Sequence, residues 1–132
     1  FAHHPTALAA TIEAARARWP SHRLVVVFEP RSLTAARRSF QGPYLEALAG
    51  ADVVCVTAPF HRGRLEASEV LDRDALRRDL ADHGVESIMP AEGEDPVPAL
   101  TNRLRPGDLV LGCSSGSFDD FHRRLLTALE PG

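Results

Sequence analysis

The sequence contains no lysine, because all 15 of its basic residues are arginine. This absence excludes a phosphate-binding loop of the G-x-x-x-x-G-K-[ST] type and any mechanism that uses a lysine Schiff base. The arginines are scattered along the chain and the net charge is −3. A dedicated nucleic-acid-binding surface is therefore not expected.

Long hydrophobic runs and cysteines are also scarce. No apolar run approaches the roughly 18 residues of a membrane span, and no signal peptide is visible, so we expect a cytoplasmic domain without a membrane. Both cysteines, Cys55 and Cys113, lie in apolar strand-like runs, where cysteine usually acts as a small hydrophobe. The 132 residues make one domain, whose core needs neither disulfides nor metal. Because the chain begins with Phe1 and not Met, we expect it to be part of a longer protein.

Four short apolar runs predict β-strands. They are Leu24–Phe28, Val53–Thr57, Val85–Met89 and Leu109–Cys113. The first, second and fourth are continuously apolar, which is typical of parallel strands covered on both faces. The third alternates imperfectly, which indicates a place nearer the edge of the sheet.

Helices are predicted between these strands. The first starts at Pro5, stops at Pro20 and carries an apolar stripe of Leu8, Ile12, Ala15 and Trp19. A second is expected from a cap at Ser32 or Thr34 to Phe40, where Gly42-Pro43 breaks it, and a short helix then covers Tyr44 to Leu48. A third helix is expected from a cap at Asp72 to Gly84, with Leu71 and Leu76 spaced as a hydrophobic staple. The next helix is expected from Asp95-Pro96 to Leu104. The last is expected to begin at Ser117 or Asp119 and to carry an apolar stripe of Phe118, Phe121, Leu125 and Leu129.

Strands that alternate with helices predict an α/β fold, in which a Rossmann-like, open and mostly parallel sheet has helices on both faces. We expect residues 1–132 to form this single domain. The first helix has no strand before it, so we expect that strand upstream of Phe1. In such a sheet the ligand lies beyond the carboxyl ends of the strands, and the loops that follow the strands are the places to look.

Adjacent histidines precede the first helix. His3 and His4 stand at a helix N-terminus, which favours an anion, so an imidazole here is suited to a carboxylate or phosphate. The alternative is a helix cap beside a surface histidine. Metal binding is weaker still, because adjacent histidines do not easily face one ion and no carboxylate stands at ligand spacing.

Arg31 directly follows a buried strand and a proline. An arginine at this edge is suited to bidentate binding of a carboxylate, and the alternative is an ion pair with Glu29. In the loop after the next strand, His61, Arg62 and Arg64 supply positive charge, or form a solvated polar loop.

Ser114-Ser115-Gly116-Ser117 is a loop of small residues in which backbone N–H groups can approach an anion. It lacks the glycines of a nucleophile elbow. Asp119 and Asp120 after it are suited to a positive group on a ligand, although acids in the first turn of a helix are also favoured by its dipole. Cys113 has no evident base partner, so a buried strand cysteine is the better interpretation. No self-sufficient catalytic group emerges, and we predict no metal site.

Three motifs resemble the C-terminal domain of Mur ligases, which build the bacterial cell-wall peptide. They are Phe1–Ala7 (FAHHPTA), Val27–Thr34 (VFEPRSLT) and Gly112–Leu126 (GCSSGSFDDFHRRLL), and they span the whole chain in order. The second resembles, apart from Leu33, the branch that joins L-Ala-γ-D-Glu-meso-diaminopimelate to UDP-N-acetylmuramate. The third departs from that branch, because Ser115, Ser117, Asp119 and Asp120 replace asparagine and glycines.

The resemblance implies an ATP-dependent amide ligase that works in peptidoglycan recycling. ATP and Mg²⁺ are then expected in a central domain of the full-length enzyme, and neither is expected on this domain alone, which we predict to be inactive by itself. Its partners are the peptide, UDP-N-acetylmuramate and that central domain. The candidate substrate-binding residues are His3, His4, Arg31, Ser32, Thr34, His61, Ser114, Ser115 and Gly116. The alternative is a stand-alone α/β module that binds a nucleotide or an anionic metabolite without catalysis.

Overall fold

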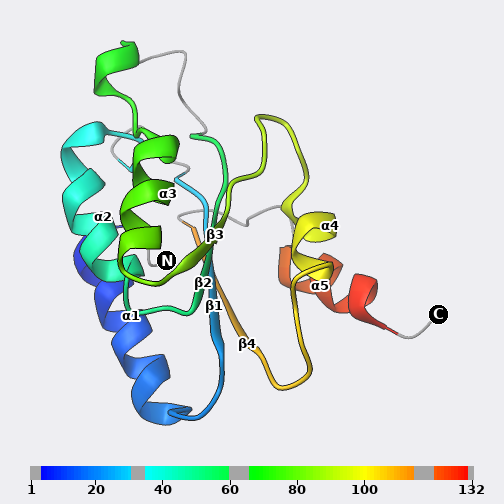
Figure 1. Ribbon diagram of the computed structural model, residues 1–132. Helices are drawn as coiled ribbons and strands as arrows, with labels where there is room; N and C mark the ends of the chain where they lie inside the picture. The colour runs from blue at the N-terminus through cyan, green and yellow to red at the C-terminus, as the bar shows by residue number, and fades with distance from the viewer. Residues whose placement is uncertain (1–3, 31–34, 60–65, 115–120, 131–132) are drawn as a thin grey trace.

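The computed structural model describes residues 4–30, 35–59, 66–114 and 121–130 (Figure 1). Its sheet contains four parallel strands in the order β3-β2-β1-β4. The strands are β1 (Leu24–Phe28), β2 (Val53–Val56), β3 (Glu86–Ile88) and β4 (Leu109–Cys113). The α/β fold and its open parallel sheet are therefore as the sequence predicts.

Helices cover both faces of the sheet, with α1, α2 and α3 on one side and α4 and α5 on the other (Figure 1). Their bounds are α1 (Pro5–Arg18), α2 (Gln41–Leu48), α3 (Arg73–Asp82), α4 (Pro96–Thr101) and α5 (Phe121–Leu129), with short 3₁₀ helices η1 (Arg38–Phe40) and η3 (Ala67–Glu69). The strands are parallel and the helices connect them, so each helix runs back across the sheet in the opposite direction. The helix N-termini and the carboxyl ends of the strands therefore gather at one edge of the sheet.

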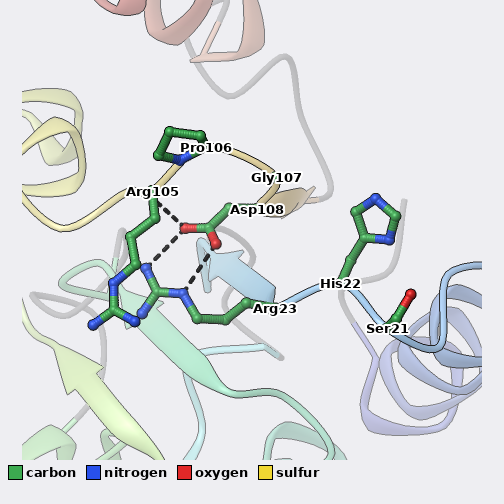
Figure 2. A pocket seen from close by; sticks show the side chains of 7 residues that line it. All are labelled: Ser21, His22, Arg23, Arg105, Pro106, Gly107 and Asp108. Atoms are coloured by element: carbon green, nitrogen blue, oxygen red, sulfur yellow. Dashed lines mark hydrogen bonds and ion pairs between the residues drawn. The ribbon is translucent and has the colours of Figure 1, made fainter.

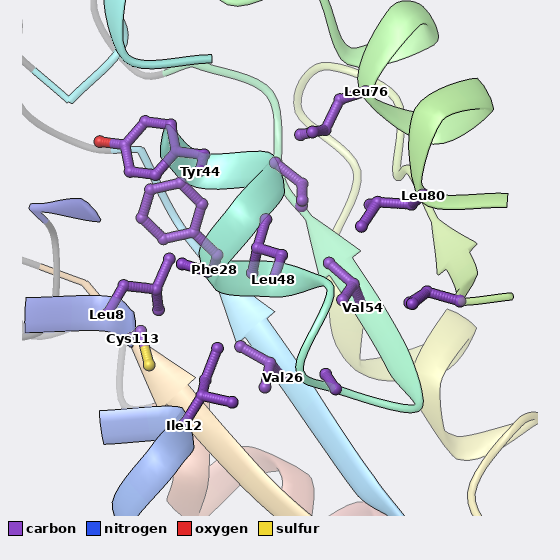
Figure 3. Packing of buried hydrophobic residues seen from close by; sticks show 14 of the residues in the cluster. Leu8, Ile12, Val26, Phe28, Tyr44, Leu48, Val54, Leu76, Leu80 and Cys113 are labelled. Atoms are coloured by element: carbon purple, nitrogen blue, oxygen red, sulfur yellow. The ribbon is translucent and has the colours of Figure 1, made fainter. Parts of the chain in front are cut away.

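The core has two layers because side chains alternate along the central strand. Val26 and Phe28 face α1–α3, whereas Val25 and Val27 face α4 and α5. In the first layer Phe28 packs against the ring of Tyr44, with ring centroids 4.7 Å apart (Figure 3). The central strand is fully buried on both faces, which its continuous apolar run predicts.

The α3 prediction is confirmed in detail. The Asp72 side chain accepts a hydrogen bond of 3.0 Å from the backbone N–H of Ala75, and both staple residues, Leu71 and Leu76, are buried. Gly84 follows the helix with a φ of 76°, a left-handed conformation that suits glycine.

The predicted helix before Phe40 is wrong for the residues that the structure describes. Arg37 forms an antiparallel bridge with Val70, and between Arg37 and Gln41 the chain forms only the short η1. The expected break at Gly42-Pro43 is also wrong, because α2 begins at Gln41 and contains both residues. The first N–H groups of a helix have no partner within the helix, so Pro43 in the first turn costs no hydrogen bond.

Three smaller expectations are also corrected. Helix α1 ends at Arg18, so Trp19 falls outside its buried stripe and remains partly exposed, with the Arg18 guanidinium 5.1 Å from its ring. Helix α4 ends at Thr101 instead of Leu104. Leu129 is 47% exposed instead of completing the buried stripe of α5.

Strand β4 is less covered than its apolar sequence suggests. Among the described residues it pairs only with β1, so it lies at an edge of the described sheet, and its first four residues are half-buried. The expectation that it is covered on both faces is therefore wrong. The edge position predicted for β3 is confirmed.

Candidate functional site

Three polar residues stand level with one another at the carboxyl edge of the sheet. Phe28 of β1 is in register with Val56 of β2 and Cys113 of β4, so the residues that follow them form a row. We call Glu29, Thr57 and Ser114 the polar row. Two backbone hydrogen bonds continue the sheet to this level, from Thr57 N–H to the Phe28 carbonyl (3.1 Å) and from Glu29 N–H to the Cys113 carbonyl (2.9 Å).

A short hydrogen bond joins two members of the polar row. The Ser114 hydroxyl donates to Oε1 of Glu29 over 2.6 Å, within the range of charge-assisted O–H···O⁻ bonds. Ser114 is only 4% exposed and Glu29 is half-buried, so the bond is partly shielded from water. Because the two residues begin the chain segments after β1 and β4, the bond ties together the starts of two segments that carry predicted substrate-binding residues.

His4 caps α1. Its Nδ1 accepts a hydrogen bond of 3.3 Å from the backbone N–H of Thr6, and its ring meets Phe40 edge-on with centroids 5.2 Å apart. The cap requires an Nδ1 atom without a proton. The structure thus gives His4 the role of a helix cap and joins the start of α1 to the end of η1.

The other candidates lie outside the described residues. These are His3, Arg31, Ser32, Thr34, His61, Arg62, Arg64, Ser115, Gly116, Ser117, Asp119 and Asp120. Their predicted roles, including the alternative pairing of Arg31 with Glu29, stay predictions. Of the predicted substrate-binding residues, His4 and Ser114 are the two that lie within the described ranges.

The segments that carry Arg31 and His61 are joined at their far ends. The backbone N–H of Leu71 donates to the Ala36 carbonyl (2.8 Å), and Nε of Arg38 donates to the Val70 carbonyl (3.0 Å). Residues that follow β1 and β2 are therefore fixed to each other at a distance from the sheet as well as at its edge.

Arg73 occupies the carboxyl edge on the β2–β3 side, and sequence reasoning missed it. Its guanidinium donates to the carbonyl of Val56, the last residue of β2 (2.9 Å), and to the carbonyl of Pro90, two residues beyond β3 (2.6 Å). The sequence gives little signal for this role, because an arginine in the first turn of a helix opposes the helix dipole. The carbonyls it satisfies belong to residues far away in the chain.

The two cysteines are not nucleophiles. Both are buried, and burial raises the pKa of Cys55 to about 12 and that of Cys113 to about 11. Since the thiolate is the reactive form, both thiols are inert near neutral pH. The prediction that they act as small hydrophobes is confirmed, because each packs in one of the two apolar clusters.

His122 lies over β4 close to this edge. A Cβ atom at position 112 would stand 2.6 Å from Cε1 and 2.8 Å from Nε2 of the His122 ring. Any residue other than glycine would therefore clash with the ring in this position. The ring also meets Phe121 edge-on, with centroids 5.4 Å apart. The His122 ring therefore lies directly over the backbone of Gly112, in the strand that leads to Ser114.

A groove of about 360 Å³ lies at the opposite edge, where β1 and β4 begin (Figure 2). Within it, Nε and Nη2 of Arg23 donate to Oδ1 and Oδ2 of Asp108 over 3.0 and 2.8 Å. The Arg23 guanidinium holds the pKa of the Asp108 carboxyl below its ordinary value. This pair fastens the start of β1 to the turn before β4, away from the loops where the predicted substrate residues gather.

Within residues 4–30, 35–59, 66–114 and 121–130, no group of three or more histidine, cysteine, aspartate or glutamate side chains is arranged to hold a metal ion. In the same ranges, no helix has the length and apolar character needed to cross a membrane.

Comparisons with known proteins agree on one family. Residues 1–116 match the family described as Mur ligase, glutamate ligase domain. The UDP-N-acetylmuramate–L-alanine ligase of Halorhodospira halophila is 36% identical over 133 residues, which span 100% of this chain and 27% of that protein. The ligase of the same name from Bordetella petrii is 34% identical over 118 residues, covering 89% of this chain and 25% of its own length. The chain thus spans about a quarter of the length of these curated relatives.

Two solved structures share the fold. A domain assigned to a UDP-N-acetylmuramate:L-alanyl-γ-D-glutamyl-meso-diaminopimelate ligase of Haemophilus ducreyi is 32% identical, with a TM-score of 0.70 over 98% of this chain and 87% of that one. A murein peptide ligase of Psychrobacter arcticus is 26% identical, with a TM-score of 0.71 over 98% of this chain and 26% of its own. Sequence and fold therefore agree that the chain belongs to the Mur ligase family and corresponds to its glutamate ligase domain, the C-terminal domain of these ligases.

Proposed function

We propose that the chain is the amine-substrate domain of a murein peptide ligase. In this proposal the enzyme uses ATP to join L-Ala-γ-D-Glu-meso-diaminopimelate to UDP-N-acetylmuramate, as a step of peptidoglycan recycling in the cytoplasm. The observation that carries the proposal is the bond between Glu29 and Ser114. It links the segment with the Val27–Thr34 motif, which resembles the tripeptide-using branch, to the segment that begins at Ser114.

The relatives support two amines. The Haemophilus ducreyi domain, which matches this chain over most of both lengths, carries the tripeptide in its name. The name of the Halorhodospira halophila relative contains L-alanine, and this relative has the higher sequence identity to the chain, 36% against 32%. L-Alanine is therefore the second candidate, and in both cases the other substrate is UDP-N-acetylmuramate.

The chemistry assigns this domain the task of binding and orientation. ATP would supply the phosphoryl group that activates the muramoyl carboxylate as an acyl phosphate, and the amine would then attack its carbonyl and displace inorganic phosphate. Attack requires the amine within about 3–3.5 Å of that carbonyl, with water excluded. A separate domain that binds the amine and then closes on a central domain meets both needs.

The residues of the chain fit this role. The tripeptide carries several carboxylates, and Arg31, His3 and His61 are predicted at the edge to which the helix N-termini point. We assign no step through nucleotide or metal to this chain, because it has no lysine and its described residues form no cluster suited to a cation. We place ATP and Mg²⁺ in the central domain of the same enzyme.

The test compares the two amines directly. The full-length protein is supplied with UDP-N-acetylmuramate, ATP and either the tripeptide or L-alanine, and the amide product is followed by mass spectrometry. We expect a higher kcat/KM for the tripeptide, and no turnover by the 132-residue chain alone. A product with L-alanine only selects the second candidate. No amide with either amine contradicts the proposal and favours a binding module without catalysis.

A further inference from the structure

The hydrogen-bond ladder between β2 and β3 reaches a proline at the carboxyl edge of the sheet. The ladder begins with the backbone N–H of Glu86, which donates to the Asp52 carbonyl over 3.3 Å. In a parallel ladder such bonds recur at every second residue, so the Val56 carbonyl faces the backbone nitrogen of residue 90. That residue is Pro90, which has no N–H group. The backbone of the next strand therefore cannot supply the last bond of the ladder.

Arg73 supplies the donor instead. Its Nη1 atom donates to the Val56 carbonyl over 2.9 Å and to the carbonyl of Pro90 itself over 2.6 Å. Val56 and Pro90 are both buried, and a buried carbonyl without a donor costs free energy. These two bonds explain why α3 keeps an arginine in its first turn, where the helix dipole opposes a positive charge.

The peptide unit between Val56 and Thr57 is thus held from two sides. Its N–H donates to the Phe28 carbonyl of β1 (3.1 Å), and its carbonyl accepts from Arg73. Thr57 is the member of the polar row that continues β2. Its place in the row is therefore set by β1 on one side and by the first turn of α3 on the other.

We propose that Arg73 is a positioning residue for the amine substrate. It replaces the N–H that Pro90 lacks, and so fixes the level at which the chain leaves β2 and its separation from the chain that leaves β3. The inference rests on the proposed function and deepens it, because the segment after β2 is one of those predicted to bind the amine. Arg73 acts on the substrate only through the backbone that it holds.

Substitutions of Arg73 in the full-length protein measure this role. Arg73→Met removes the donor and keeps a long side chain, so it should lower the thermal unfolding temperature and raise KM for the amine by about fivefold or more. KM for ATP should stay unchanged. Arg73→Lys keeps a donor nitrogen on a shorter side chain and should fall between Arg73→Met and the wild type. Arg77→Met, on an exposed side chain of the same helix, is the matched control.

A second substitution tests the replacement itself. Pro90→Ala restores a backbone N–H opposite the Val56 carbonyl. In the Arg73→Met background it should recover part of the lost unfolding temperature and return KM for the amine to within about twofold of the wild type, because the two residues share one acceptor. In the wild-type background, where Arg73 already occupies that acceptor, Pro90→Ala should change KM little.

Each contrary result overturns a defined part of the proposal. If Pro90→Ala recovers neither quantity, Arg73 does not replace the missing N–H. A lower unfolding temperature in Arg73→Met with the KM values of Arg77→Met leaves Arg73 a purely structural role. If Arg73→Met does not fold, Arg73→Lys with and without Pro90→Ala makes the same comparison. A wild type that ligates neither amine overturns the proposed function and the positioning role with it, whereas the replacement stands or falls on the unfolding temperatures.

Discussion

Ser114 and Glu29 are 85 positions apart in the sequence and share a hydrogen bond of 2.6 Å at the carboxyl edge of the sheet. The bond sets the relative position of the segments after β1 and β4 before any ligand arrives. In a ligase that must hold an amine against an activated carbonyl, such preorganisation acts on the binding of the amine.

Ser114→Ala should therefore weaken the binding of the amine. We expect a several-fold higher KM for the amine and an unchanged KM for ATP, together with a loss of about 1–2 kcal/mol in the free energy of unfolding, because a bond to a charged acceptor disappears. Steady-state kinetics and urea unfolding measure the two effects. Glu29→Gln keeps an acceptor oxygen and should be milder, and exposed Ser39→Ala is the matched control. Equal KM values in Ser114→Ala and Ser39→Ala would leave the bond a purely structural role.

Arg31 is predicted to hold a carboxylate of the peptide. In the full-length enzyme, Arg31→Ala should raise KM for the peptide far more than KM for ATP, by a factor that corresponds to about 2–3 kcal/mol. Arg77→Ala on α3 removes the same charge from an exposed side chain and serves as control. If both variants bind the peptide like the wild type, Arg31 is not a substrate ligand.

His3 and His4 are expected to differ in role. His4→Ala removes the cap of α1 and the edge contact with Phe40, so it should lower the free energy of unfolding by about 1 kcal/mol. His3→Ala should lower kcat/KM for the peptide and leave the melting temperature nearly unchanged. A melting curve and a peptide titration of each variant are sufficient. Reversed results would exchange the two roles, and unchanged turnover in both would make the motif a helix start alone.

The Arg23–Asp108 pair predicts a dependence of stability on pH. The pKa of Asp108 is lowered in the folded chain, chiefly by its hydrogen bond to Arg23. A lowered folded pKa stabilises the fold above the unfolded value of about 3.9, and this contribution is lost as the pH falls through the folded pKa. Asp108→Asn should therefore cost about 1–2 kcal/mol at pH 7, and the difference from wild type should shrink below about pH 4.

Urea unfolding at several pH values measures this difference. Glu13→Gln removes one negative charge from an exposed position of α1 and should leave the pH profile close to that of the wild type. A difference for Asp108→Asn that stays constant from neutral to acid pH would show that the carboxylate charge does not contribute.

The sequence predicts the strands well because a continuous apolar run leaves a clear signal, whether or not both faces of the strand are covered. Leu24–Phe28 and Leu109–Cys113 have the predicted bounds, and Val53–Thr57 is one residue too long. The helix around Gln41 is mispredicted because Gly42-Pro43 resembles a break, whereas a proline in the first turn of a helix is tolerated. The exposure of β4 depends on its neighbours in space, which its own apolar run does not record.

The candidate site is predicted in part. Ser114 follows from its loop of small residues, and His4 follows from its place before Pro5. Three features of the site depend on the register between strands. They are the hydrogen bond between Ser114 and Glu29, the buried Thr57 hydroxyl without a hydrogen-bond partner, and the position of Arg73. That register arises from packing across the whole sheet, and no local pattern encodes it.

Arg73 also changes the electrostatic character of the β2–β3 half of the sheet edge. Its guanidinium covers the carbonyl oxygens of Val56 and Pro90. The negative end of a carbonyl dipole is its oxygen, so without this side chain the β2–β3 half would expose two unpaired carbonyl oxygens that attract cations. With Arg73 in place these two oxygens are paired within the chain, and the β2–β3 half presents a guanidinium instead of bare carbonyl oxygens.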